Sequence, residues 1–115
     1  MTSYNLQEAL EALLRFRTER DWEQYHTPKN LSMSIAIEAA ELMEHFQWKS
    51  DKTPIEATEL LKIREEISYI AAYLLMLSYD LGIPLNEAML DKMKKNELKY
   101  PVEKCKGKSD KYNKL

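Results

Sequence analysis

Residues 35–44 read IAIEAAELME, and this stretch decides the fold. Apolar side chains occupy every position except Glu38, Glu41 and Glu44, which is the pattern of a helix with one acidic stripe. Glu38 and Glu41 are three residues apart, so they lie on one face about one turn apart. Because the other faces are apolar, we expect the helix to be buried, and buried carboxylates without basic partners usually hold a metal ion.

A second apolar run, residues 67–77 (ISYIAAYLLML), directly follows Glu66. If the two helices pack face to face, Glu66 meets the two acids of the first helix. Three carboxylates suit Mg²⁺, which takes hard oxygen ligands and is often shared with substrate phosphates, so the pattern favours a nucleotide site. The alternative is that these acids form a solvated helix face, or that they pair with Lys62 and Arg64.

Length and charge limit the classes of function. A chain of 115 residues is long enough for one domain with its own core. Lys and Arg total 17 against 19 Asp and Glu, which argues against a binder of duplex nucleic acid. The run after Glu66 is too short to cross a bilayer, so we expect no membrane partner. Cys105 is the single cysteine and no secretory leader is recognisable, so we expect a cytoplasmic protein without disulfides.

The order of helices and turns is readable from the sequence. With two glycines, four prolines and almost no alternation of period two, the composition predicts an all-α protein. Short connections between four helices favour a four-helix-bundle-like fold, with Gly82 in the left-handed conformation after the third helix. The predicted helices span residues 6–25 after an Asn5 cap, about 31–48 after an Asn30 cap, 54–81, and 84 to Pro101; the predicted domain covers residues 1–101 and a Lys-rich tail covers residues 102–115.

Two tryptophans lie at the ends of the first two predicted helices. Trp22 and Trp48 both stand beside charged residues. In that position a flat side chain either stacks on a nucleobase or anchors the packing of the helix, and the sequence leaves both readings open.

Polar side chains on two other helix faces could also contact a ligand. Tyr69 and Tyr73 share the face of Glu66, where a hydroxyl either binds phosphate or fills the core. Three residues at four-residue spacing suit phosphate or sugar contacts, or an ordinary amphipathic edge: Lys92, Asn96 and Tyr100.

Motifs of several enzyme classes are missing from the sequence. It has no glycine-rich phosphate loop, no nucleophile elbow and no Cys–His pair. His26 and His45 are too isolated to indicate a histidine-based metal or catalytic site. Enzyme classes that depend on these devices are therefore not supported.

The segment 19–31 reads ERDWEQYHTPKNL, and EAAEL at 38–42 and FQW at 46–48 follow it. These stretches resemble the all-α MazG-like nucleotide pyrophosphohydrolases, most closely the dCTP pyrophosphatase branch. The resemblance implies a MazG-type fold that oligomerises through helix faces, usually as dimers or paired dimers. It covers nearly the whole chain and continues through residues 65–67, 73–75, 81–83, 92–93, 96, 100–102 and 109–112.

The resemblance also implies a reaction and a cofactor. The reaction is hydrolysis of a nucleoside triphosphate between the α and β phosphates, with Mg²⁺ as cofactor and Mn²⁺ as an alternative. The acids that match the family's metal-binding motif are Glu38, Glu41 and Glu66. The family's fourth acid, an aspartate, falls on Tyr69, whose phenol has a pKa near 10 and is a poor ligand for a hard dication. Glu44 could stand in for this acid, and Glu65 could do so only in part.

Residues outside the acidic motif receive roles from the same resemblance. Trp22 and Trp48 match residues that enclose the base. Residues that match positions near the nucleotide are Tyr73, Lys92 and Asn96, and Lys111 in the tail could reach the phosphates.

Taken together, the sequence predicts a cytoplasmic Mg²⁺-dependent nucleoside triphosphate pyrophosphohydrolase that forms a homodimer or homotetramer. A pyrimidine deoxynucleotide such as dCTP is the expected substrate, and cleaning of the nucleotide pool the expected role. One alternative is a non-catalytic or metal-impaired nucleotide-binding homologue, because Tyr69 replaces a ligand. Another is a helical oligomerisation module that binds no ligand.

Overall fold

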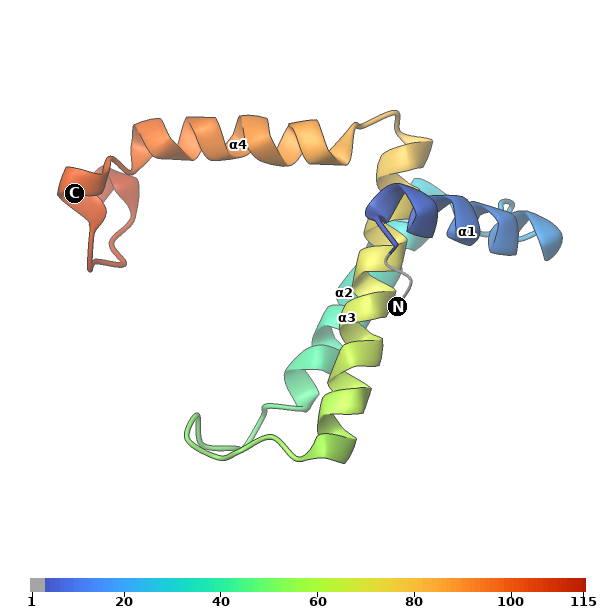
Figure 1. Ribbon diagram of the computed structural model, residues 1–115, viewed down its shortest axis with the longest axis horizontal. Coiled ribbons are helices and arrows are strands. Elements are labelled where there is room, and N and C mark those ends of the chain that lie inside the picture. The colour runs from blue at the N-terminus through green and yellow to red at the C-terminus, as the bar shows by residue number, and fades with distance from the viewer. Residues whose placement is uncertain (1–3) are drawn as a thin grey trace. The chain divides into compact units, whose positions relative to one another are not determined.

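The computed structural model describes residues 4–115, and every regular element in this range is a helix. The prediction of an all-α protein is confirmed. The chain forms two compact units, Met1–Gly82 and Ile83–Leu115, which are described separately below. The first unit holds α1 (Leu6–Glu19), α2 (Pro28–Glu44) and α3 (Ala57–Asp80), and the second holds α4 (Leu85–Lys99), α5 (Val102–Cys105) and the 3₁₀ helix η1 (Tyr112–Lys114) (Figure 1).

Helix α1 begins as predicted but ends earlier. The side chain of Asn5 caps its first turn by accepting a hydrogen bond from the backbone N–H of Glu8 at 2.9 Å. The helix ends at Glu19, so the predicted end near Tyr25 is wrong. Asp21 ends the helix by adopting the left-handed conformation (φ 55°), which glycine usually adopts at this position.

Both ends of α2 differ from the prediction. The N-cap is Thr27, whose hydroxyl oxygen accepts the N–H of Asn30 at 3.2 Å. The helix therefore begins at Pro28, where the missing N–H of proline sacrifices no hydrogen bond. It ends at Glu44 rather than Trp48, because the following residues form turns in which Trp48 is left-handed (φ 68°).

Helix α3 ends at Asp80, one residue before the predicted end, and it begins at Ala57 rather than residue 54. Gly82 is left-handed (φ 68°), as predicted for the residue that follows this helix. Among the described helices, no single one is both long and apolar enough to cross a membrane. Helices α3 and α4 reach the necessary length and apolar content only when they are taken together.

In the second unit, residues 102–115, which were predicted to form a Lys-rich tail, contain two short helices. Pro84 is the N-cap of α4, and α5 and η1 lie within residues 102–115. The ring of Tyr112 in η1 meets that of Tyr100 edge-on at 6.1 Å. The ammonium of Lys99 lies 5.0 Å from the centre of the same ring. These contacts hold the C-terminal turn against the end of α4.

In the first unit α2 and α3 lie side by side, and α1 also packs on α3 (Figure 1). Among the described residues, the buried apolar side chains are Leu31, Ile63 and Met76. The prediction that residues 35–44 are buried on all sides is wrong for a single chain, because Ile37 and Met43 are 54% and 71% exposed. One neighbouring helix covers only one stripe of α2, and its other apolar faces remain open.

Candidate functional site

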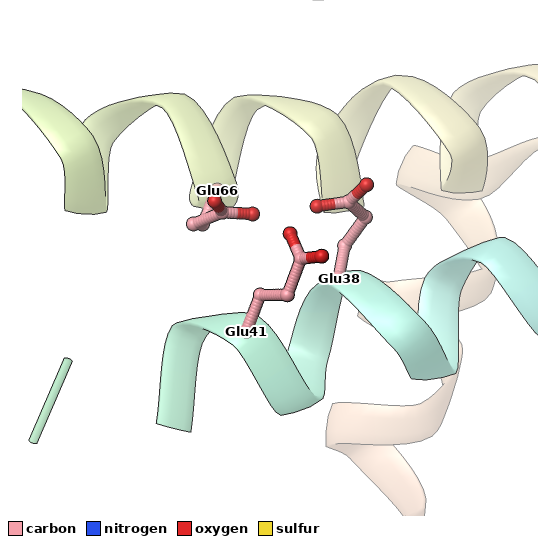
Figure 2. Close-up of side chains that lie close together, drawn as sticks. All are labelled: Glu38, Glu41 and Glu66. Atoms are coloured by element: carbon pink, nitrogen blue, oxygen red, sulfur yellow. The ribbon is translucent and has the colours of Figure 1, made fainter. Parts of the chain in front are cut away.

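Three glutamates meet between α2 and α3. Glu38 and Glu41 project from α2 and Glu66 projects from α3 (Figure 2). One carboxylate oxygen from each lies within 4.8 Å of the others. The packing of the two helices thus brings together the three acids that the sequence singled out. Lys62 and Arg64 form no ion pair within the described residues, so the alternative in which they pair with the acids finds no support. Glu41 is exposed, as on a solvated helix face, whereas Glu38 and Glu66 are half buried.

The three carboxylates of this acidic cluster (Glu38, Glu41 and Glu66) repel one another when they are ionised. The pKa of Glu38 is raised to about 7, first by a hydrogen bond that its protonated form shares with the Glu66 carboxyl, then by burial and by Glu41. The Oε2 atoms of Glu38 and Glu66 are buried without a hydrogen-bond partner among the described residues. Buried acceptors of this kind call for a donor or a cation.

The donor set fits a hard divalent cation. It consists of carboxylate oxygens alone, which suit Mg²⁺ or Mn²⁺ and not a softer metal. The two unpartnered Oε2 atoms are free to bind such a cation. Glu44 and Glu65, considered as replacements for a fourth acid, do not belong to the cluster, which within residues 4–115 comprises three acids only.

Two tyrosines lie beside the cluster. The rings of Tyr69 and Tyr73 stack with their centroids 6.3 Å apart and an interplanar angle of 19°. The pKa of Tyr73 is raised by burial, and then by the negative charge of Glu38 and by Tyr69, so its hydroxyl remains a neutral hydrogen-bond donor. Tyr69 is half exposed and contributes no carboxylate where the resemblance expected one.

The two tryptophans lie at opposite ends of α2 within one chain. Trp22 precedes the helix and Trp48 follows it, and 17 residues of α-helix span about 25 Å. Trp48 is 94% exposed, and the ammonium of the next residue, Lys49, contacts Glu59 at the start of α3. The structure therefore does not bring the two indoles together around one base in a single chain.

Three of the predicted substrate-binding residues belong to the second unit. Lys92 and Asn96 lie one turn apart on α4, and Lys111 directly precedes η1. Lys92 and Lys111 are exposed, whereas Asn96 is half buried. Their roles toward the nucleotide stay predictions.

The family model of the MazG-like family matches residues 33–115. The chain belongs to the MazG-like family. This match includes all three acids of the cluster, so the geometry described above is that of a MazG-like protein.

Named relatives of this MazG-like chain are pyrophosphatases. The dCTP pyrophosphatase 1 of Rattus norvegicus is 37% identical over 121 residues, which cover 98% of this chain and 71% of the rat protein. The dCTP pyrophosphatase 1 of Homo sapiens is 36% identical with the same two coverages. The crystal structure of a pyrophosphatase from Archaeoglobus fulgidus superposes with a TM-score of 0.72 at 40% identity, covering 88% of this chain and 96% of that one.

The structure of this MazG-like chain also contains a charged pair that the sequence prediction missed. Arg17 of α1 forms a bidentate ion pair with Asp80 at the end of α3, 63 residues away, and both N···O distances are 2.9 Å. His26 lies nearby, and its pKa is lowered by burial and by the charge of Arg17. One signal was available: Arg17 continues the stripe of Leu10, Leu13 and Leu14, so a charge stands on the apolar face of α1.

Proposed function

We propose that this chain is a nucleoside triphosphate pyrophosphohydrolase that converts a pyrimidine deoxynucleotide such as dCTP to its monophosphate and pyrophosphate. The observation that carries the proposal is that three carboxylates meet in a chain of the MazG-like family, and that no Lys or Arg of the described residues pairs with them. The names of the relatives support both the reaction and the substrate. We also propose a role in cleaning the nucleotide pool of the cytoplasm, with neither nucleic acid nor membrane as partner.

We assign Glu38, Glu41 and Glu66 as the residues that would hold Mg²⁺ or Mn²⁺. When bound, the metal would supply charge neutralisation and polarisation of the phosphoryl oxygens. Glu38 or Glu41 would accept a proton from the water that attacks the α-phosphorus. The acidic neighbours that raise the pKa of Glu38 to about 7 in the metal-free chain would be offset by a bound cation, which favours the ionised carboxylate that a proton acceptor requires.

The remaining assignments concern substrate binding. Tyr73 is near enough to Glu38 for the charge of that carboxylate to raise its pKa, and its hydroxyl would donate to a phosphate oxygen. Trp22 and Trp48 would stack on the base. The proposed contacts of the second unit are Lys92 and Asn96 with the nucleotide and Lys111 with the phosphates.

We propose that the protein acts as a homodimer or homotetramer. Because Trp22 and Trp48 lie at opposite ends of α2, both can serve one base only when they come from different copies. The apolar faces of α2 and α3 support a partner surface as well, since large exposed apolar patches mark interaction sites. The side chains on these helices that are more than half exposed include Met33, Ile37, Met43, Leu60, Leu61 and Ile67.

A specific observation favours a second candidate, a metal-impaired or non-catalytic nucleotide-binding homologue. Tyr69 leaves the cluster with three acids, where the resemblance implies four. In this candidate the base pocket is retained while metal affinity, and with it turnover, is reduced.

Release of pyrophosphate from each common nucleoside triphosphate, measured with Mg²⁺, with Mn²⁺ and with a chelator, tests the proposal. We expect release that depends on the metal and is fastest with dCTP. Thermal stabilisation by dCTP without release would favour the second candidate. If dCTP causes neither pyrophosphate release nor thermal stabilisation, the result would favour a helical oligomerisation module that binds no ligand.

A further inference from the structure

The guanidinium of Arg17 is the most deeply buried charge in the described part of the chain. Arg17 is 5% exposed, and its side chain joins the last turn of α1 to the last residue of α3 through Asp80. Asp80 raises the pKa of Arg17, mainly by the hydrogen bonds it accepts. Since Asp80 lies on a different helix, the pair holds one side of the α1 terminus in a defined place.

The backbone of Arg17 carries this placement to Trp22. The carbonyl of Arg17 accepts the N–H of Trp22 at 3.0 Å, and that of Thr18 accepts the N–H of Asp21 at 3.1 Å. With Asp21 left-handed, this is a Schellman motif, which fixes the direction in which the chain leaves a helix. Phe16 supplies the apolar contact typical of the motif, because its ring meets Trp22 edge-on at 5.6 Å.

Trp22 is braced from its C-terminal side too. Its carbonyl accepts the N–H groups of Tyr25 and His26 at 3.0 and 3.1 Å. The ring of His26 meets the indole edge-on at 6.1 Å. The indole nevertheless remains 41% exposed. A half-exposed aromatic ring with a fixed backbone is a preorganised surface for stacking.

The ion pair is poorly explained as a device for stability alone. Burying two charges costs free energy that apolar side chains of similar size would not cost. Within the described residues, Nε of Arg17 lacks a partner, which adds to that cost. An open groove, lined by apolar side chains such as Leu13, Phe16 and Leu75, runs between α1 and α3. The two hydrogen bonds of the bidentate pair fix the orientation of the end of α1 against the end of α3, which this loose packing alone would not do.

We propose that the Arg17–Asp80 ion pair is a positioning device that fixes the indole of Trp22 for stacking on the nucleobase. Arg17 is a positioning residue in this account, since it acts through Trp22 and not on the substrate. The proposal rests on the proposed function for the role of Trp22 in the base site. Its structural half, that the ion pair orders the indole, is independent of any substrate.

A double-mutant cycle on KM for dCTP tests the link between the two residues. We expect Arg17→Met to raise KM roughly tenfold, within the range for loss of one stacking contact, and to leave kcat within about a factor of two. In a Trp22→Ala background, Arg17→Met should change KM no further, because the residue through which it acts is gone. Additive effects of the two substitutions would overturn the proposal.

Two further variants separate positioning from stability. Arg17→Lys keeps one charge but loses the bidentate fork, so it should fold and still raise KM. Ile63→Val is the matched control: it removes a methylene from a residue buried on α3 away from Asp80, and should lower the unfolding temperature by a few degrees without raising KM. An unchanged KM in Arg17→Lys, or a raised KM in Ile63→Val, would overturn the proposal.

A measurement without ligand keeps the test separate from the proposed function. In Trp48→Phe protein, Trp22 is the one remaining tryptophan. Adding Arg17→Lys should lower the fluorescence anisotropy of Trp22 and shift its emission to longer wavelength. If the parent chain hydrolyses no nucleotide, the proposed function fails, and the anisotropy still decides whether the pair orders the indole. Unchanged anisotropy and emission would overturn the ordering itself.

Discussion

The first unit holds two groups of charged side chains between its helices, and they are built in opposite ways. Arg17 and Asp80 carry opposite charges and meet through two hydrogen bonds of 2.9 Å. The acidic cluster gathers three like charges within 4.8 Å and leaves two carboxylate oxygens without partners. The opposite charges of the pair neutralise each other within the chain, although Nε of Arg17 has no partner among the described residues, whereas the like charges of the cluster call for a cation that the chain does not supply.

This difference predicts opposite consequences for neutralisation. Removing one member of an opposite pair leaves a buried charge unpaired and should destabilise the fold. Removing one charge from a cluster of like charges relieves repulsion and should stabilise the metal-free fold while abolishing function. Stability and activity therefore respond differently at the two places.

The largest effect is expected at the cluster. Glu38→Gln or Glu41→Gln should reduce pyrophosphate release to background, because each removes a carboxylate without creating a cavity. Circular dichroism should show an unchanged helix content, and the metal-free variants should unfold at the same or a higher temperature. Turnover close to that of the parent in either variant would exclude the cluster as the active site.

The next effect is expected at the pair. Arg17→Met should lower the free energy of unfolding by about 3 kcal/mol, at the low end of the range for breaking a buried pair, since the Asp80 side chain is 23% exposed. Urea denaturation followed by circular dichroism measures it. Replacing both partners, as in Arg17→Met with Asp80→Leu, should restore most of the loss. A stabilising effect of Arg17→Met would contradict the contrast between the two groups.

A third effect would sharpen the comparison by adding an acid to the cluster. Tyr69→Asp should raise the rate of pyrophosphate release about tenfold at low Mg²⁺, and by less when Mg²⁺ is saturating. About tenfold is the lower end of the activity typically lost when a residue that supports a metal ligand is removed. The metal-free variant should be less stable, and Mg²⁺ should restore it. Tyr69→Phe serves as the control, because it removes the hydroxyl without adding a charge. An unchanged rate and Mg²⁺ dependence would favour the non-catalytic candidate.

The last effect concerns pH. The pKa of Glu38 is raised from 4.5 to about 7 in the fold, so the native state binds more protons than the unfolded chain between these values. This contribution is fully present below pH 4.5 and is lost as the pH rises through 7. His26, whose pKa is lowered, contributes the opposite slope. The metal-free parent should therefore lose more stability than Glu38→Gln between pH 4.5 and 7; equal losses would place the pKa of Glu38 near its ordinary value.

The parts of the structure that follow from local rules were predictable. The three-residue spacing of Glu38 and Glu41 sets them on one face of any helix. The cap at Asn5 and the left-handed Gly82 follow from the chemistry of single residues. The approach of Glu66 was also predictable, because two apolar runs joined by a short connection pack side by side.

The predictions that failed concern residues whose conformation depends on more than their own type. Asp21 and Trp48 are the described non-glycine residues with positive φ, and each lies just past the end of a helix that was predicted too long. Asp adopts this conformation more often than most non-glycine residues do, whereas Trp rarely does, so residue type gave a weak signal at Asp21 and none at Trp48. At Asp21 the conformation accompanies the two backbone hydrogen bonds that close the end of α1, and a periodicity of apolar residues does not report such bonds. The side chain of Trp48 is 94% exposed, so packing does not explain its conformation.

The sequence alone determined the helical class and the acids that share a face, because both depend on residues within a few turns of one another. Only the tertiary structure joined Arg17 to Asp80 across 63 residues and placed Trp22 and Trp48 at opposite ends of α2. It also left most apolar faces of α2 open, although the sequence pattern called for their burial. The physical reason is that periodicity states which faces avoid water, whereas the partner that covers each face is chosen by packing in three dimensions.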